Sequence, residues 1–186
     1  MEKDRMCPWW MGYMLLIPFR KFSHNPNKML GPFIKQGMNV LDYGCAMGYF
    51  SLPMAKLTGN NGKVFCVDIQ EKMLARLQQR SRKARLDHII NPLLVGKTFD
   101  PGKLLDQIDF TLLFYVVHEI PDKAKLFNDI FRMTKRGGRV LFTEPSGHVS
   151  AIDFERSKHM AMSAGFAVTD EKPTSSGLSV LLVRQN

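Results

Sequence analysis

VLDYGCAMGYF, residues 40–50, decides the fold of this chain. Two apolar residues end a short strand, an acid and two glycines form a turn, and an apolar-periodic segment then begins. A strand, a glycine turn and a helix in this order form a ligand-binding corner of an open α/β sheet, because glycine lets the backbone approach a ligand closely and a helix N-terminus attracts negative charge. The spacing Gly44-x-x-x-Gly48 alone fits a plain strand-to-helix connection equally well, so the interpretation depends on the rest of the chain.

The size and charge of the chain bound its function. Its 186 residues are enough for one self-sufficient domain, and 45% apolar with 23% charged residues is typical of a globular protein. The 26 Lys and Arg residues exceed the 17 Asp and Glu residues by nine, which favours an anionic partner. Many of these cations lie along one predicted helix at residues 72–85, and a solvated helix face explains them better than a nucleic-acid surface does.

The cysteines and the N-terminal apolar run exclude several classes. Cys7, Cys45 and Cys66 are too scattered for a disulfide framework or a zinc site, so we predict no metal. A thiol-based metalloid site at the last two is disfavoured against ordinary buried cysteines. The apolar run from Met11 to Phe19 is too short to span a bilayer, and no convincing cleavage site follows it. We expect a cytoplasmic protein with no membrane span, and its oligomeric state is open.

Residues 1–37 differ from the rest and are predicted to form a helical extension or a lid. Large apolar groups gather around Trp9 and Trp10, and Asn25 with Pro26 after it opens a short helix that Gly37 would end. Such a segment either extends the core or folds over the ligand cleft, and core packing is the favoured use. The second domain then spans residues 38–186.

Beyond this segment the chain alternates between strands and helices. Apolar runs predict strands that end at Leu41 or lie at 63–68, 89–95, 108–114, 140–144, 166–171 and 178–183, and helical periodicity predicts helices at 49–57, 70–84, 122–133 and 150–164. The last two strands are joined by a connection too short for a crossover helix, so they are antiparallel neighbours. The pattern predicts an α/β fold: a Rossmann-like, doubly wound, seven-stranded and mostly parallel sheet with an antiparallel terminal hairpin.

Four motifs in this order resemble the class I S-adenosylmethionine-dependent methyltransferases, in particular their small-molecule branch. Residues 40–50 are similar to the family's first motif, and residues 64–68 to its second strand, whose terminal acid holds the ribose hydroxyls. DFTLLFYVVHEIPD at 109–122 resembles the fourth strand with its loop, and KRGGRVLFTEP at 135–145 resembles the fifth-strand motif. The resemblance covers roughly residues 38–186 and implies that they form a methyltransferase domain.

The sequence departs from this family at two places. Ala46 stands where the family usually has its middle glycine, and a positive φ there would be strained. The segment Val95-Gly96-Lys97-Thr98 contains no acid, whereas the family usually has one after its third strand to accept from the adenine amino group.

The resemblance implies S-adenosylmethionine as the cofactor and S-adenosylhomocysteine as the product. A carboxylate can accept two hydrogen bonds from a ribose diol, so Asp68 at a strand end is the candidate for this contact. Asp42 is expected to orient the glycine loop or to accept from the methionyl ammonium. As alternatives, Asp68 would only cap the next helix and Asp42 would only stabilise the turn. The other candidates for cofactor binding lie in the glycine turn or directly after strands two and four: Gly44, Cys45, Gly48, Ile69, Phe114 and Tyr115.

Methyl transfer is an in-line displacement that needs alignment and a dry pocket, and it needs a base only where the nucleophile carries a proton. His118 and Glu119 follow the fourth strand and His148 follows the fifth, at the strand ends where an open α/β sheet binds its ligand. These three are the candidate catalytic residues, because a histidine can take a proton near neutral pH. A loop-ordering role for His118 is equally open.

The sequence therefore favours a methyltransferase that acts on a small-molecule acceptor. The loop after strand four lacks an Asn/Asp-Pro-Pro-aromatic signature, which favours O, C or S over amide or base nitrogen as the methylated atom. An NAD-dependent oxidoreductase is one alternative, since it shares the glycine corner and the strand-two acid, but the glycine spacing departs from GxGxxG. A basic nucleic-acid-binding module is the other, and it is not favoured.

Overall fold

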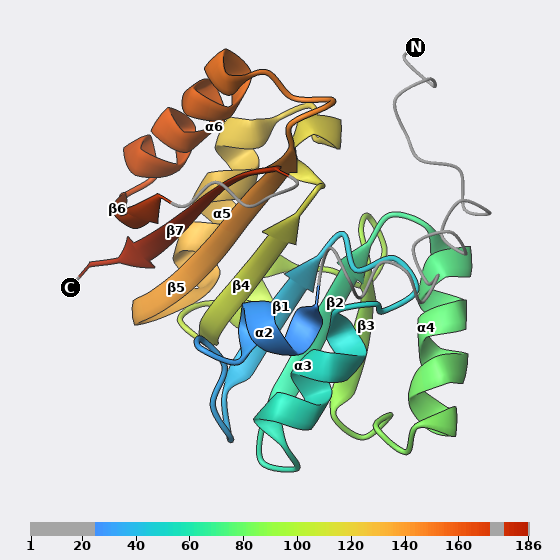
Figure 1. The fold of residues 1–186 in the computed structure, drawn as a ribbon. Helices are drawn as coiled ribbons and strands as arrows, with labels where there is room; N and C mark the ends of the chain where they lie inside the picture. Colours follow the sequence, from blue (N-terminus) through green and yellow to red (C-terminus); the bar gives the residue numbers. More distant parts are fainter. Residues whose placement is uncertain (1–24, 172–176, 186) are drawn as a thin grey trace. The chain divides into compact units, whose positions relative to one another are not determined.

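The computed structural model describes residues 25–171 and 177–185, and the chain divides into two compact units at Phe99 and Asp100 (Figure 1). Most of the predicted extension, residues 1–24, lies outside the described residues, and so does the connection at 172–176. The predicted boundary at residue 37 therefore stays a prediction.

The first unit is a parallel three-stranded sheet with its helices. Its elements are α2 (Pro26–Leu30), β1 (Asn39–Tyr43), α3 (Ser51–Thr58), β2 (Lys63–Asp68), α4 (Glu71–Lys83) and β3 (Ile90–Leu94). The strand order is β3-β2-β1, and Leu41 of β1 pairs with Phe65 of β2, which pairs with Asn91 of β3. Val40, Leu41 and Val64 are fully buried, as parallel strands covered on both faces require. This register brings the carboxyl ends of β1 and β2 to the same edge.

The helix α2 begins as predicted but is shorter. The Asn25 side chain accepts from the backbone N–H groups of Asn27 and Lys28 at 3.1 and 3.3 Å. The helix ends at Leu30 and not near Gly37, because Pro32 has no N–H to continue the helical hydrogen bonds.

The second unit contains the terminal antiparallel hairpin. Its elements are η2 (Pro101–Leu104), β4 (Ile108–Phe114), η3 (Val117–Glu119), α5 (Lys123–Met133), β5 (Thr134–Pro145), α6 (Ala151–Ser163), β6 (Phe166–Glu171) and β7 (Gly177–Arg184). The order is β4-β5-β7-β6, with β4 parallel to β5, and with β7 antiparallel to both β5 and β6. The seven strands, mostly parallel with an antiparallel terminal pair, confirm the predicted fold class.

The helices α5 and α6 pack side by side on one face of β5 (Figure 1). Phe142 of β5 lies between them, with its ring centroid 5.7 Å from that of Phe127 and 4.9 Å from that of Phe154. All three rings are buried, so they form the aromatic centre of this unit's core.

The strand β5 begins at Thr134 and not at Val140 as predicted. Ile108 of β4 pairs with Thr134, but Phe110 already pairs with Arg139, so the residues between form a bulge. Gly137 has a φ of 73° and supplies the left-handed residue that such a bulge needs. Gly137 and Gly138, which precede the predicted strand, are therefore part of β5.

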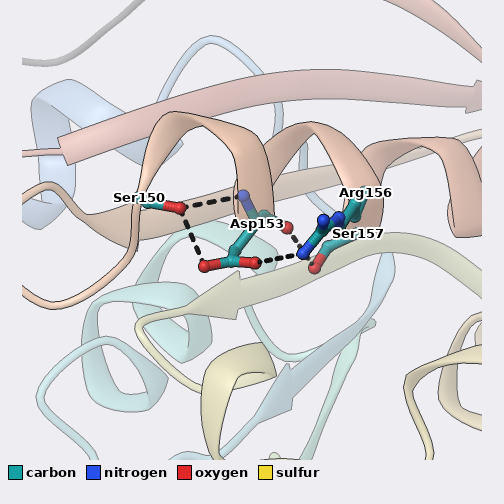
Figure 2. Close-up of polar contacts among 4 residues, drawn as sticks. All are labelled: Ser150, Asp153, Arg156 and Ser157. Atoms are coloured by element: carbon teal, nitrogen blue, oxygen red, sulfur yellow. Dashed lines mark hydrogen bonds and ion pairs between the residues drawn. The ribbon is translucent and has the colours of Figure 1, made fainter.

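A reciprocal cap opens α6, as Figure 2 shows. The Ser150 hydroxyl accepts from the Asp153 backbone N–H at 3.1 Å and donates to the Asp153 carboxylate at 2.8 Å. Arg156 donates to the other oxygen of this carboxylate at 3.1 Å, and the Ser157 hydroxyl donates to the Asp153 carbonyl at 2.9 Å. The cap fixes the point at which the turn after β5 enters the helix, in agreement with the predicted start.

Candidate active site

The glycine loop between β1 and α3 contains three left-handed residues. Gly44, Ala46 and Gly48 have φ values of 78°, 45° and 79°. A Cβ on Gly48 would lie 2.3 Å from Leu77 Cδ1, so both conformation and space require glycine there. Ala46 keeps the left-handed conformation despite its methyl group, and this conformation costs a residue other than glycine roughly 1–2 kcal/mol.

The N–H groups of this loop bond to the protein. Those of Gly44 and Cys45 both donate to the Val67 carbonyl on β2, at 2.8 and 3.0 Å. The N–H of Ala46 donates to Asp68 Oδ2 at 2.9 Å. We expected loop N–H groups to approach a ligand, and these three instead hold the loop against the end of β2.

Two N–H groups at and just before the start of α3 also donate to backbone carbonyls. The Gly48 N–H donates to the Cys45 carbonyl at 2.9 Å, and the Leu52 N–H donates to the Gly48 carbonyl at 3.4 Å. The next residue is Pro53, which has no N–H. A phosphate bound at a helix N-terminus needs several free N–H groups, so this corner is poorly equipped for one.

Asp42 joins the two ends of the loop. Its carboxylate is 3% exposed and accepts from the hydroxyl of Ser51, the first residue of α3, at 2.5 Å. Burial raises the pKa of Asp42 to about 7, with a further increase from the nearby charge of Asp68, and the Ser51 hydrogen bond opposes this shift. The carboxyl that joins the two ends of the loop therefore changes charge near neutral pH.

Asp68 links the loop to the start of α4. Its Oδ2 accepts from Ala46, and its Oδ1 accepts from the Gln70 N–H at 2.8 Å. Burial raises its pKa, while backbone hydrogen bonds from Gln70, Ala46 and Ile69 oppose the shift. A carboxylate offers about four acceptor positions, so the three backbone hydrogen bonds leave Asp68 about one further position for the ribose diol. The neighbouring Ile69 side chain is 56% exposed and available to a flat apolar ligand.

Arg80 is a loop contact that sequence reasoning missed. It was grouped with the solvated cations of the helix at 72–85, but its guanidinium donates to the Met47 carbonyl in the glycine loop. Burial lowers the pKa of Arg80 from its ordinary value. Its position one turn beyond the buried Leu77 was the signal that this cation reaches back to the loop.

In the second unit, a histidine and a glutamate form a tight pair. Glu144 Oε1 accepts from the His118 backbone N–H at 3.0 Å, and Glu144 Oε2 lies 2.5 Å from His118 Nδ1. The glutamate side chain is 2% exposed and the histidine side chain 30%. The hydrogen bond with Glu144 raises the pKa of His118, with further increases from the charges of Glu144 and Glu119, while burial and Lys123 oppose the shift.

Phe114 is the last residue of β4, and Tyr115 directly follows it. Their rings stack with centroids 4.0 Å apart, and Tyr115 has a φ of 58°. The Tyr115 N–H donates to the Thr143 carbonyl at 2.8 Å, which holds this strained residue at the end of the strand.

Gly177 is a second residue that sequence reasoning did not identify. The predicted strand begins at residue 178, yet Gly177 already belongs to β7 and pairs with Pro145. A Cβ on it would lie 2.2 Å from the Glu144 carbonyl oxygen and 3.2 Å from Tyr115 Oη. Only glycine therefore allows β7 to pack against the residue that holds His118.

The other two candidate catalytic residues occupy different surroundings. Glu119 is half-buried next to His118 in η3. His148 is exposed in the turn between β5 and α6, where its backbone N–H donates to the Pro145 carbonyl at 3.0 Å. In the described part of the chain, no hydrogen bond joins the His148 side chain to the His118–Glu144 pair.

Cys45 and Cys66 are buried free thiols. Within residues 25–171 and 177–185, no group of three or more His, Cys, Asp and Glu side chains is arranged to hold a metal ion. Within these residues, no helix has the length and the apolar composition that crossing a membrane requires.

The family model described as a methyltransferase domain matches residues 34–174. A demethylmenaquinone methyltransferase from Halalkalibacterium halodurans is 27% identical over 113 residues, which are 61% of this chain and 45% of that protein. One of the same name from Bacillus subtilis is 26% identical over 61% of this chain and 48% of its own length. The chain spans about half the length of the curated relatives that it matches.

Solved structures match the fold over most of the chain. A SAM-dependent methyltransferase from Aquifex aeolicus has a TM-score of 0.84 with 22% identity, over 96% of this chain and 100% of that chain. Fibrillarin from Aeropyrum pernix, in complex with natively bound S-adenosyl-L-methionine, has a TM-score of 0.64 with 21% identity, over 81% of this chain and 68% of that chain. At these identities the likeness shows the fold.

Proposed function

We propose that this chain, which belongs to the methyltransferase domain family, transfers a methyl group from S-adenosylmethionine to a small-molecule acceptor. The predicted family and fold class are confirmed by the family match and by the structural neighbours. The sites of cofactor and acceptor, and the acceptor itself, belong to the proposal.

The observation that carries the proposal is the pair of buried acids at the carboxyl ends of β1 and β2. Asp42 and Asp68 are 3% and 9% exposed, burial raises the pKa of both, and the charge of Asp68 raises the pKa of Asp42 further. A cationic ligand relieves this repulsion, because an opposite charge nearby favours the ionised carboxylate. S-adenosylmethionine supplies a sulfonium, an ammonium and a ribose diol, and each of these complements a carboxylate.

The hydrogen bonding of the loop argues against a dinucleotide. A pyrophosphate carries negative charge and is bound by free backbone N–H groups at a helix N-terminus. Here the N–H groups of Gly44, Cys45, Ala46 and Gly48 already donate to protein oxygens, and two acids lie beneath the loop. These features favour S-adenosylmethionine over NAD.

We assign the cofactor contacts by the chemistry of each side chain. Asp68 accepts from the ribose hydroxyls, and the exposed Ile69 beside it covers an apolar face of the cofactor. Gly44, Cys45 and Gly48 shape the loop, and Asp42 keeps it in position through Ser51. That the stacked Phe114 and Tyr115 of the second unit also contact the cofactor stays a prediction.

A small molecule is the acceptor class that the relatives support. The curated relatives are named demethylmenaquinone methyltransferases, after a small-molecule acceptor. The cations that favoured a nucleic-acid partner include Lys72, Arg76 and Arg82, which are exposed along the single helix α4. This arrangement is that of a solvated helix face.

Calorimetry with the full chain tests the proposal. We expect S-adenosylhomocysteine to bind and NAD not to bind. Asp68→Ala should weaken S-adenosylhomocysteine binding by about 1.5–3 kcal/mol through the loss of charged hydrogen bonds. Asp87→Ala is the matched control, because Asp87 is exposed and lies in the same unit. This variant should bind S-adenosylhomocysteine as the wild type does. Binding of NAD alone would overturn the cofactor, and unchanged affinity in Asp68→Ala would remove that residue from the site.

A further inference from the structure

We propose that Glu144 is a positioning residue that holds His118 as a general base with its free lone pair on Nε2, and that the acceptor reacts through an ionisable aromatic or enolic hydroxyl. This inference rests on the proposed methyl transfer and specifies its acceptor class. Neither the family match nor the names of the relatives assigns a base.

The two hydrogen bonds of Glu144 determine which ring nitrogen carries the proton. An ionised carboxylate only accepts, so its Oε2, 2.5 Å from His118 Nδ1, requires a proton on Nδ1. Its Oε1 accepts from the His118 backbone N–H at 3.0 Å, which fixes the carboxylate plane as well. In the neutral imidazole the lone pair then lies on Nε2, the nitrogen that can take a proton from a ligand.

Burial separates the two partners by function. The Glu144 side chain is 2% exposed, whereas 30% of the His118 side chain is accessible. Because Nδ1 is held against the buried carboxylate, the opposite edge of the ring is the one left for a ligand. The raised pKa of His118 makes the imidazole a stronger base, and Glu119 beside it adds negative charge in the same direction.

A base of this kind matters most for a hydroxyl acceptor, because a thiol, with a pKa of about 8.5, already ionises in part near neutral pH and a neutral amine attacks with its own lone pair. The hydroxyl proton moves to His118 Nε2, and the electron pair of the resulting oxyanion forms the bond to the methyl carbon. The bond between this carbon and sulfur breaks with its electron pair going to sulfur, which gives neutral S-adenosylhomocysteine. Where the adjacent ring carbon attacks instead of oxygen, a keto–enol shift restores the hydroxyl. The imidazolium, paired with Glu144, returns its proton to water.

The same contacts also pin η3 to the end of β5, so a purely structural role has to be separated from base positioning. Glu144→Gln does this. The His118 backbone N–H can only donate, so the amide oxygen of the new side chain must face it, and the amide NH2 must then face Nδ1. The loop stays attached by two hydrogen bonds, but the ring proton is forced to Nε2, where it blocks proton uptake.

Nitrogen-15 NMR of histidine-labelled full-length protein reads this tautomer directly. We expect Nδ1–H in the wild type, Nε2–H in Glu144→Gln, and a lower pKa for His118 in the variant. Glu155→Gln on α6 is the matched control, since its side chain is half-exposed and Lys158 keeps its second partner, Glu171. The Nε2–H tautomer in the wild type, or an unchanged tautomer in Glu144→Gln, would overturn the positioning role.

Turnover tests the acceptor class. Release of S-adenosylhomocysteine is measured with catechol, 1,4-dihydroxynaphthalene, a thiol and an amine as probes. We expect turnover of a hydroxyl probe, and a decrease of about 10²–10⁴-fold in kcat for Glu144→Gln with S-adenosylhomocysteine affinity unchanged. Turnover of only the thiol or amine, or of no hydroxyl probe, would overturn the hydroxyl class. If the wild type does not bind S-adenosylhomocysteine, this result would instead contradict the proposed function.

Discussion

Asp42→Asn should change how the stability of this protein depends on pH. Asp42 is 3% exposed with a pKa raised to about 7, against 3.8 for an ordinary aspartate. The unfolded chain therefore loses this proton first as the pH rises, and the folded state is destabilised by about 1.4 kcal/mol per pH unit between the two pKa values. The stability contributed by the neutral carboxyl is fully present below pH 3.8 and is lost as the pH approaches 7.

Integrated from pH 4.5 to 7, this loss is about 3 kcal/mol, and it flattens above the folded pKa. The asparagine variant does not titrate, and its amide oxygen can still accept from Ser51. Urea unfolding of both proteins between pH 4.5 and 8 gives the difference in the free energy of unfolding at each pH. We expect this difference to shift in favour of Asp42→Asn by about 3 kcal/mol over that range.

Asp87→Asn is the control, because Asp87 is exposed and lies in the same unit. A change of the same size with pH in this variant would mean that the effect does not come from the buried position of Asp42. A difference for Asp42→Asn that stays constant from pH 4.5 to 8 would refute the reasoning, since it would mean that Asp42 titrates alike in the folded and unfolded chains.

Three further substitutions test backbone and packing in both units. Ala46→Gly should raise the free energy of unfolding by about 0.5 kcal/mol, because relief of the left-handed strain exceeds the entropy cost of glycine. Its control, Ala75→Gly on α4, should lower the free energy of unfolding by about 1 kcal/mol. Equal losses in both variants would contradict the strain at Ala46. Gly177→Ala should lower the free energy of unfolding by about 1–3 kcal/mol and should lower the His118 pKa, because the new methyl group displaces Glu144. If NMR gives the wild-type pKa for His118 in this variant, then β7 moves and Glu144 does not. Ser150→Ala should lower the stability by about 1 kcal/mol in urea unfolding, and no change would mean that the cap of Figure 2 is replaced by water.

Local signals were enough to predict most elements. Asn25, Asp122 and Ser150 cap helices that begin where the sequence indicated, because a cap depends on hydrogen bonds within three residues. The antiparallel terminal strands followed from a connection too short for a crossover. Such features depend on residues that are close together in the sequence, so a single sequence is enough to predict them.

Features that depend on distant partners were not predictable in the same way. The bulge at Gly137 exists because β5 pairs with β4 through a register shift, and the sequence showed only a glycine pair typical of a turn. Arg80 reaches the Met47 carbonyl across 33 positions, and His118 meets Glu144 across 26. His118 was a candidate from the sequence, but its pairing with Glu144 was not predicted, because strand register decides which acid lies beside it.

Three acids at strand ends show how position and partner together determine chemistry. Asp42, Asp68 and Glu144 close β1, β2 and β5 at or near their last residues, and all three are buried. Asp42 bonds to a hydroxyl, which leaves its own pKa raised by burial, and Asp68 bonds to backbone N–H groups with acceptor capacity remaining. Glu144 bonds to an imidazole and raises the pKa of that partner, His118. The position of an acid at a strand end therefore does not determine its chemistry in this fold, because the three acids differ in the group to which each is hydrogen-bonded.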